Sequence, residues 1–538
     1  MLRTMKSIRY LLLLAVFGLV AVYSCSGEPV DAGAVLQRGL PADPETLDQH
    51  KARSTQAADV LRDLGEGLVG YSPTGELVPA AAESWEVSED GRTYTFHLRP
   101  EARWSNGDRV TSEHFVFAFR RLVTPATAAF YANMLADVVN AAGAVAGDVP
   151  AEKLGVEAVD DVTLVVRLER PTPYLLSLLT HPSTFPLHPA SVAEHGDSFA
   201  RPGTLISNGA FTLEAWVPGS ALALRRNEKY WNDAATALDG VNYHVVVQDA
   251  AELNRYRAGE LHITSTVPPD NFEELKVQFG DELRVAPYLG IYYYGFNLLK
   301  PPFKDNPELR QALSMAVDRE QLATKVLGRG EVPAFSWVPP GVSSYKPTVM
   351  SFATLGREAR ENLARRLYKE AGYSDENPLR IEVRYNTSDT NKKIAAAVQS
   401  MWRNVLGVEA TLVNEEFQVL LANMRDAEVT QVFRSSWMGD YNDAHTFLSV
   451  LQAGSAANMP RYANEEYESL MQRAASQVDD QRRRLYLEEA ERVMLADHPV
   501  LPLYFFVSKH LVRPEVGGWG DNVLDYHYSQ HLSLSATQ

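Results

Sequence analysis

The chain has 538 residues, of which 45% are hydrophobic and 22% are charged, as is typical of folded globular proteins. A chain of this length predicts several lobes or domains and excludes a single ordinary core. Its formal net charge of −17 repels phosphate backbones, so we expect no general binding to nucleic acid. The single cysteine excludes an internal disulfide and a zinc site built from clustered cysteines.

The N-terminus has the pattern of an export signal. Three basic residues precede an unbroken apolar run over residues 11–22, which is too short to span a bilayer as a stable helix. The cysteine that follows, Cys25, has a small residue before it and resembles the lipobox of bacterial lipoprotein signal peptides. We therefore predict a signal peptide over residues 1–24, acylation of Cys25, and a mature chain in the periplasm or cell envelope. An ordinary signal peptide with an incidental cysteine is the alternative.

Hydrophobic patterns along the chain predict helices and strands in irregular alternation, which indicates a mixed α/β fold. Pro499 and Pro502 are expected to separate the last helix from the last strand. In chain order the predicted elements are a helix over 57–64, a strand over 93–98, a helix after Thr111, a strand over 164–168, a helix from Asn306-Pro307, a helix over 481–496 and a strand over 503–507.

Motifs for catalysis or metal binding are missing from the sequence. The 13 histidines are scattered, and no metalloprotease, nucleophile-elbow or P-loop pattern occurs. Residues 65–70 satisfy the pattern of a dinucleotide-binding loop, but a helix is predicted before them instead of a strand. We interpret this segment as a helix end and turn. We expect no enzyme activity, no metal and no cofactor.

A segment rich in aromatic and acidic residues, 437–443, is the first candidate for a binding site. Arg425 and Arg434 precede it, and residues 292–294 form a run of three tyrosines. An aromatic-walled cleft would use such an acid to bind a cation and such arginines to bind an anion. A surface loop beside a core strand explains the same pattern, and composition does not decide between them.

Short motifs in a fixed order resemble those of the oligopeptide-binding proteins of bacterial ABC importers, in family 5 of the extracellular solute-binding proteins. The resemblance covers essentially all of the mature chain, and residues 385–388 and 437–442 are similar to the oligopeptide branch. The eight motifs lie at 43–48, 81–87, 96–99, 104–107 with 110–111, 208–211, 226–231, 255–260, and 310–313 with 318–319.

This resemblance implies an α/β fold of the periplasmic-binding-protein type, class II or cluster C. Two lobes joined by a hinge close around the ligand, and an extra domain is added to the first lobe. The implied boundaries are 26–65, 191–289 and 508–538 for lobe I, 66–190 for the extra domain II, and 290–507 for lobe III.

The resemblance also assigns ligand-binding residues. In the oligopeptide branch, the aspartate of a W-x-x-D-Y-N motif binds the α-amino group of the peptide, and Asp440 matches it. The peptide main chain pairs like a strand with two segments, which match Arg53-Ser54-Thr55 and Ser436 to Met438. Other positions that match ligand-contacting or cleft residues are Tyr131, Asn386, Arg425, Arg434 and Trp437.

Some features depart from those of relatives. A cysteine pair of some relatives corresponds to Gly290 and Met438, and an aromatic hydroxyl in the cleft corresponds to Phe506. Leu327 replaces a basic residue that meets the carboxyl end of shorter peptides, so the preferred peptide length is open.

The expected partners are short peptides and the transmembrane subunits of an ABC permease, with a monomeric protein held at the membrane by its lipid alone. A specialised ligand on the same fold is the first alternative: a murein peptide, a signalling peptide or haem. A secreted peptidase is the second alternative, although no catalytic motif supports it.

Overall fold

The computed structural model describes residues 33–268 and 272–535 of the chain. The predicted signal peptide over residues 1–24 and the predicted lipidation site Cys25 lie outside the described residues. Within the described ranges, no helix is both long and apolar enough to cross a membrane.

Lobe I is built on a four-stranded sheet with the order β1-β10-β9-β8, in which only the β1–β10 pair is parallel. Helix α2 packs on this sheet through residues at helical spacing, such as Val60, Leu61 and Leu64. The elements of lobe I and its neighbourhood are β1 (Val35–Leu40), α2 (Thr55–Leu64), α6 (Pro189–His195), β8 (Phe211–Val217), β9 (Ala221–Arg226), β10 (Gly240–Val245), α7 (Asp249–Arg257), α8 (Phe272–Phe279), β17 (Val516–Gly517) and β18 (Ser533–Leu534).

Domain II contains a separate antiparallel sheet with the order β4-β5-β7-β6. Phe115, Phe119 and Leu122 form the buried face of α3 and pack in the core of this domain. The elements are the hairpin strands β2 (Val69–Tyr71) and β3 (Leu77–Pro79), then β4 (Ala82–Val87), β5 (Thr93–Leu98), α3 (Ser112–Val123), α4 (Ala141–Ala146), β6 (Val156–Asp160), β7 (Thr163–Arg167) and α5 (Leu175–Leu178).

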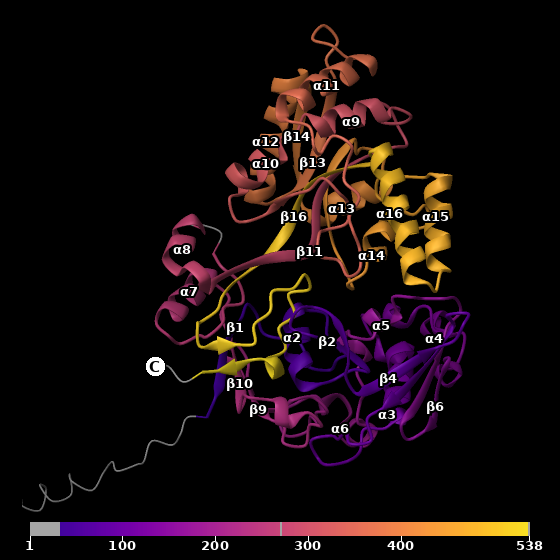
Figure 1. Ribbon diagram of the computed structural model, residues 1–538, viewed down its shortest axis with the longest axis vertical. Coiled ribbons are helices and arrows are strands. Elements are labelled where there is room, and N and C mark those ends of the chain that lie inside the picture. Colours follow the sequence, from indigo (N-terminus) through magenta and orange to yellow (C-terminus); the bar gives the residue numbers. More distant parts are fainter. Residues whose placement is uncertain (1–32, 269–271, 536–538) are drawn as a thin grey trace, which may run out of the picture.

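Lobe III, the upper body in Figure 1, surrounds a six-stranded sheet with the order β12-β16-β11-β15-β13-β14. Its core buries Tyr292, Tyr293 and Tyr294 of β11 together with two tryptophans. The elements are β11 (Leu283–Phe296), α9 (Pro307–Met315), α10 (Arg319–Gln321), β12 (Val332–Pro333), α11 (Arg357–Glu370), β13 (Arg380–Asn386), α12 (Asp389–Leu406), β14 (Glu409–Glu415), α13 (Phe417–Asp426), β15 (Val432–Met438), α14 (His445–Leu448), α15 (Glu465–Ala475), α16 (Asp480–Asp497) and β16 (Val500–Leu511).

Strands β11 and β16 join the two lobes. They run antiparallel from the pair Leu283–Leu511, near lobe I, to the pair Gly295–Val500 inside lobe III (Figure 1). Their register is interrupted between Pro287 and Ile291. Two long strands that share hydrogen bonds form a hinge that allows bending at the interruption while both lobes stay connected.

The structure confirms the helices and strands that the sequence predicts, with one error at the last strand. Pro502 does not precede this strand but lies within β16, which begins at Val500. Proline removes a donor from a ladder, so it is tolerated in a sheet mainly at irregularities. Here Pro502 lies opposite Tyr293, directly beside a register shift.

Candidate functional site

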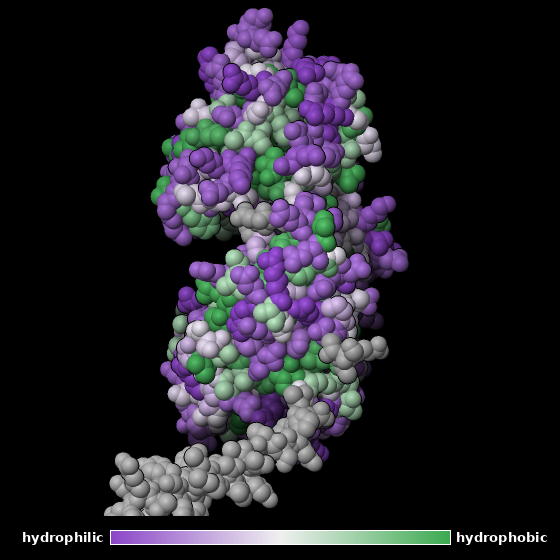
Figure 2. Space-filling view, turned by 90° about the vertical axis from the view of Figure 1, so that its left-hand side faces the viewer, coloured by the Kyte–Doolittle hydropathy of each residue, from purple (hydrophilic) through white to green (hydrophobic). Residues whose placement is uncertain are grey.

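A cleft lies between lobe III and the lower part of the molecule, beside the hinge strands. Figure 2 shows the surface hollowed between the two masses. The cleft has a volume of about 380 Å³ and is lined from below by the start of α2 and from above by residues 438–440. Tyr288 of β11 and residues 524–527 form the part of the wall next to the hinge.

Strand β15 carries four of the predicted site residues and has an open edge toward its C-terminal end. On one side it pairs with β11 from Val432 to Met438. On the other side, its pairing with β13 covers only Val432 and Phe433. Within the described residues, the segment from Arg434 to Met438 therefore presents an unpaired strand edge, which offers main-chain donors and acceptors to an extended ligand.

Asp440 follows this edge on a loop that is held from both sides. Its N–H donates to Thr446 Oγ1 at 3.2 Å, and the N–H of Gly439 donates to the carbonyl of Leu289 at 2.8 Å. The next residue, Tyr441, stacks on Tyr174 of domain II with ring centroids 5.0 Å apart. These contacts fix the position of Asp440 at the mouth of the cleft.

The Asp440 carboxylate forms no ion pair with any described residue, although its side chain is exposed to the cleft. The surrounding protein removes part of its hydration, which raises the pKa of the Asp440 carboxyl above its ordinary value. Tyr131 lies on the opposing wall of the cleft. Burial is the main cause that raises the pKa of Tyr131, and the nearby Asp440 charge raises it further. A cation entering here would restore the lost stabilisation of the carboxylate.

The segment Arg53-Ser54-Thr55 was expected to pair with the peptide main chain like a strand, but it leads directly into helix α2. Ser54 is the N-cap of α2 and its Oγ accepts from the Ala57 N–H at 3.2 Å, while Thr55 begins the helix. The main-chain N–H groups of Arg53 and Ser54 both donate to the Glu45 carboxylate. The Arg53 carbonyl accepts from the Tyr131 hydroxyl at 3.3 Å and the Ser54 carbonyl accepts from the Ala58 N–H at 3.1 Å, so in this conformation the main-chain groups of Arg53 and Ser54 are already paired.

A second group of predicted residues lies higher on the wall of lobe III. Arg434 donates to Asn386 Oδ1 at 3.2 Å and to Ser436 Oγ at 3.3 Å, and its guanidinium lies 4.7 Å from the centroid of the Tyr292 ring. Trp437 points to the other face of β15 and packs against the core of lobe III, and within the described residues its Nε1 is buried without a hydrogen-bond partner. Arg434, Asn386 and Ser436 form one cluster, although neither they nor Trp437 line the cleft beside Asp440 in this conformation.

Other predicted positions are placed as follows. Arg425 is exposed in the last turn of α13, and its side chain forms no hydrogen bond with the described residues. The tyrosine run over 292–294 belongs to the core and not to an aromatic cleft wall. Gly290 and Met438 face each other in the β11–β15 ladder, so these positions are adjacent, as a cysteine pair in relatives requires.

Several cleft residues were not found by sequence reasoning. They include Tyr288, His181, Arg62 and the pair Asp525 and His527. These residues come from four separate stretches of the chain, and none lies in a recognisable motif. Only the folding of the hinge and the C-terminal segment brings them together.

Two lobes that are joined by paired strands and separated by a ligand-sized cleft define a bilobal solute-binding protein. A model of the family described as "Bacterial extracellular solute-binding proteins, family 5 Middle" matches residues 76–459. The chain belongs to this family of solute-binding proteins.

Two relatives in Escherichia coli (strain K12) illustrate the range of named ligands. The chain is 36% identical over 503 residues to the periplasmic oligopeptide-binding protein OppA, and the aligned region covers 93% of this chain and 92% of OppA. It is 38% identical over 511 residues to YgiS, described as a probable deoxycholate-binding periplasmic protein, with 94% and 95% covered. Sequence identity alone therefore does not decide the ligand.

Solved structures of similar sequence identity differ in how well they superpose. The unliganded open form of the murein tripeptide-binding protein MppA matches with a TM-score of 0.88 at 34% identity, covering 94% of this chain and 99% of that one. Haemophilus influenzae OppA in complex with the peptide RPPGFSPFR matches with a TM-score of 0.72 at 36% identity, again covering 94% of this chain and 99% of that one. The chain therefore superposes more closely on the unliganded open form of one relative than on the peptide complex of the other, although the two identities are nearly equal.

Proposed function

We propose that this protein captures oligopeptides outside the cytoplasm by their main chain and α-amino group, and delivers them to an ABC permease. The observation that carries the proposal is the Asp440 carboxylate, which has no ion-pair partner in the described residues and follows an open strand edge. An ammonium group meets this carboxylate in a charge-assisted hydrogen bond, while the main chain of the peptide pairs with residues 434–438.

This mode of binding suits a receptor that accepts many sequences. All unmodified peptides share a main chain and an α-ammonium group, so affinity from these groups does not depend on side chains. Side chains then occupy the remaining space, where bridging waters cost little free energy. The peptide complex of a relative that is 36% identical supports the same ligand class.

The superposition on the unliganded open form of MppA supports a second part of the proposal, namely that the lobes close when a ligand binds. In a closed cleft, the Asp440 charge without a ligand would be buried and unpaired, which is costly. A bound ammonium removes this cost, so we propose that the peptide favours closure and that the permease reads the closed form.

Replacement of Asp440 by asparagine tests the proposal. We expect Asp440→Asn to weaken the binding of an unmodified peptide by about 2–5 kcal/mol, because the ammonium then loses its charged partner in a closed cleft. Asp281→Asn changes an exposed aspartate away from the cleft and serves as the matched control. Isothermal titration calorimetry measures both variants, and equal affinity of wild type and Asp440→Asn would refute the assignment.

A specialised peptide is the second candidate, because a relative that is 36% identical over 502 residues is named a murein peptide-binding protein. A murein or signalling peptide with a free α-amine would use Asp440 in the same way. Mass spectrometry of ligand that co-purifies with the protein distinguishes a mixture of peptides from one defined molecule.

The proposal places the mature protein in the periplasm or cell envelope, exported by residues 1–24 and anchored through acylated Cys25. It acts as a monomeric binding protein without catalysis, with the boundaries of lobes I and III and domain II given above. A Cys25→Ser variant is expected in the soluble fraction, and a variant that stays with the membrane would contradict the lipid anchor.

A further inference from the structure

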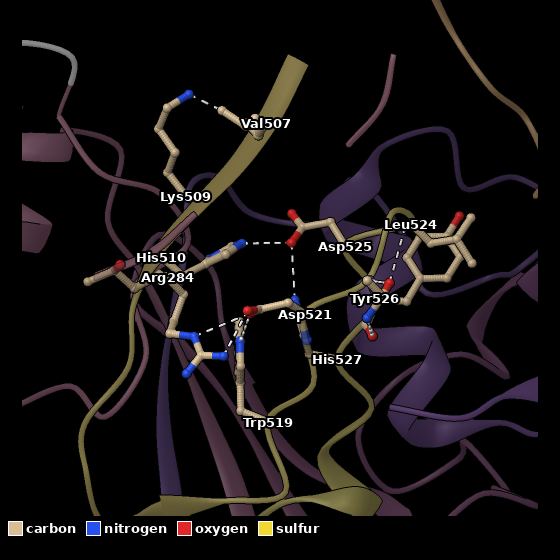
Figure 3. Close-up of polar contacts among 12 residues, drawn as sticks. Arg284, Val507, Lys509, His510, Trp519, Asp521, Leu524, Asp525, Tyr526 and His527 are labelled. Atoms are coloured by element: carbon tan, nitrogen blue, oxygen red, sulfur yellow. Dashed lines mark hydrogen bonds and ion pairs between the residues drawn. The ribbon is translucent and has the colours of Figure 1, made fainter. Parts of the chain in front are cut away.

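Two histidines and an aspartate converge where the hinge reaches lobe I. His510 lies on β16, and Asp525 and His527 lie on the C-terminal segment (Figure 3). The Nε2 atoms of His510 and His527 lie 2.8 Å and 3.1 Å from the same oxygen, Asp525 Oδ1. One possible ligand atom from each residue lies within 4.8 Å of the other two.

This set of donor atoms matches a transition metal. Imidazole nitrogen with carboxylate oxygen suits Zn²⁺, Ni²⁺, Cu²⁺ and Co²⁺ better than Mg²⁺ or Ca²⁺, which prefer oxygen alone. Ligand atoms about 2.1 Å from a tetrahedral ion lie about 3.4 Å from one another. The separations of 2.8 Å and 3.1 Å from Asp525 Oδ1 need to open by about 0.6 Å and about 0.3 Å to admit an ion.

The His510 ring is held in the orientation that a metal ligand requires. Its Nδ1 lies 2.8 Å from the carbonyl oxygen of Thr264. A carbonyl accepts and does not donate, so Nδ1 carries a proton. Nε2 lies against a carboxylate oxygen, which also accepts, so in the metal-free protein Nε2 donates a proton to Asp525, and a bound ion takes the place of that proton. A backbone carbonyl behind a ligating histidine is a common feature of metal sites.

The His527 ring is fixed by a second set of contacts. Trp519 stacks on it with ring centroids 3.6 Å apart and an angle of 17° between the planes. Trp519 Nε1 donates to Asp521 Oδ1 at 2.9 Å, and Asp521 pairs with Arg284 of β11 at 2.7 Å. Arg38 of β1 also donates to the main-chain carbonyl of His527 at 2.8 Å. These contacts limit the ring movement that would otherwise oppose metal binding.

The cluster is open toward the cleft on one side only. The side chains of His510 and His527 are 10% and 5% exposed, whereas that of Asp525 is 26% exposed. Asp525 Oδ2 forms no hydrogen bond with the described residues, and all three side chains line the cleft. Carboxylates outnumber guanidinium groups along this lining, which favours a cation: Asp59, Asp440 and Asp525 against Arg38 and Arg62.

We propose that His510, Asp525 and His527 bind one divalent transition-metal ion at the wall of the cleft. Three protein ligands leave a coordination position open, and the exposed side of Asp525 directs it into the cleft. The bound ion links β16 to the C-terminal segment at the end of the hinge. This site is separate from the Asp440 loop, and its existence does not depend on the proposed peptide ligand.

Titration of Zn²⁺ into protein without a histidine tag, after treatment with a chelator, tests the proposal by calorimetry. We expect one Zn²⁺ per chain, with affinity lowered roughly 100-fold in His527→Gln and His510→Gln. His97→Gln is the matched control, because His97 lies in domain II, away from the cleft, and should leave the affinity unchanged.

Circular dichroism establishes that each variant is folded, and the visible absorption of Co²⁺ in the wild-type protein provides a readout that needs no variant. Intense bands of a four-coordinate Co²⁺ complex support the site. A wild-type protein that binds no Zn²⁺, or the same Zn²⁺ affinity in all three variants, overturns the proposal.

Discussion

At the scale of single residues, the proposed function depends on one carboxylate whose surroundings differ from water. Asp440 faces the cleft, and partial loss of hydration raises the pKa of its carboxyl. The contacts of Gly439 and Tyr441 hold the loop in place before any ligand arrives. Such preorganisation reduces the ordering cost of binding.

The affinity for peptide should depend on pH through this group. Only ionised Asp440 attracts an ammonium, so affinity falls by about tenfold per pH unit once the pH is below the raised pKa of Asp440. Calorimetry between pH 7.5 and pH 4.5 measures the fall, and Asp440→Asn should lose this component of the pH dependence. The same pH profile in wild type and variant would show that another group is responsible.

The sequence pattern indicated the acidic segment 437–443, and the family resemblance added Ser54, Thr55 and Tyr131, which also line the cleft. An aspartate beside tryptophan and tyrosine is visible in one stretch of sequence. Tyr288, Asp525 and His527 line the same cleft as Asp440 only because the chain folds back through the hinge strands. Proximity between residues so far apart in the sequence produces no local sequence pattern.

At the scale of elements, main-chain pairing between strands determines which strand edge is open and where a proline is tolerated. The edge of β15 is open because β13 pairs with only its first two residues. Amphipathic spacing and caps predicted the helices near Thr111 and Asn306 correctly, because these signals are local. Pro502 was assigned wrongly, since the irregularity that accommodates it depends on the neighbouring strand β11.

A buried carboxylate joins α16 to the loop over residues 337–348. Glu491 accepts from the N–H groups of Trp337 and Val338 on one oxygen, and from the Thr348 N–H and the Tyr345 hydroxyl on the other. In Glu491→Gln, the amide nitrogen replaces one oxygen and faces two donors. We expect a loss of about 2–5 kcal/mol in the free energy of unfolding.

Urea denaturation measures this loss. Glu488→Gln on the same helix is the control, because its side chain is half-buried and forms only a surface ion pair with Arg484. Equal stability of Glu491→Gln and the wild type would contradict the role of Glu491.

At the scale of the whole molecule, the lobes are separate bodies with separate cores, connected by β11 and β16. The division into two lobes and an extra domain was predicted from family resemblance and not from periodicity. Hydrophobic patterns report which side of an element is buried, but the partner that buries it depends on chain topology. The position of one lobe relative to the other, in particular, produces no pattern in the sequence.

Stability of the whole protein should fall as the pH is lowered below 6.5. Burial lowers the pKa of eight histidines outside the His510 cluster. The shift is large in five of them, to about 3 for His50, His181 and His498 and about 4 for His114 and His445. These rings stay neutral in the fold but take up protons in the unfolded chain. Each extra proton bound by the unfolded chain costs about 1.4 kcal/mol per pH unit.

Carboxyl groups whose pKa is raised by burial act in the opposite direction, and the shift is large in two of them. Burial raises the pKa of Glu66 and Glu491 to about 7, so the stability they contribute is present at low pH and is lost as the pH rises through 7. Five histidines outweigh two carboxyls, so the melting temperature should decrease between pH 6.5 and pH 4.5. Calorimetric scans that show a constant or increasing melting temperature over this range would contradict the assigned pKa directions.

The most direct measurement of the central claim is a thermodynamic cycle that combines Asp440→Asn with N-acetylation of the same peptide. If Asp440 binds the α-ammonium group, each change alone removes the same interaction, and both together cost little more than one. Calorimetry of the four combinations should therefore show strongly non-additive losses. Additive losses, or full affinity of the wild-type protein for the acetylated peptide, would contradict the account.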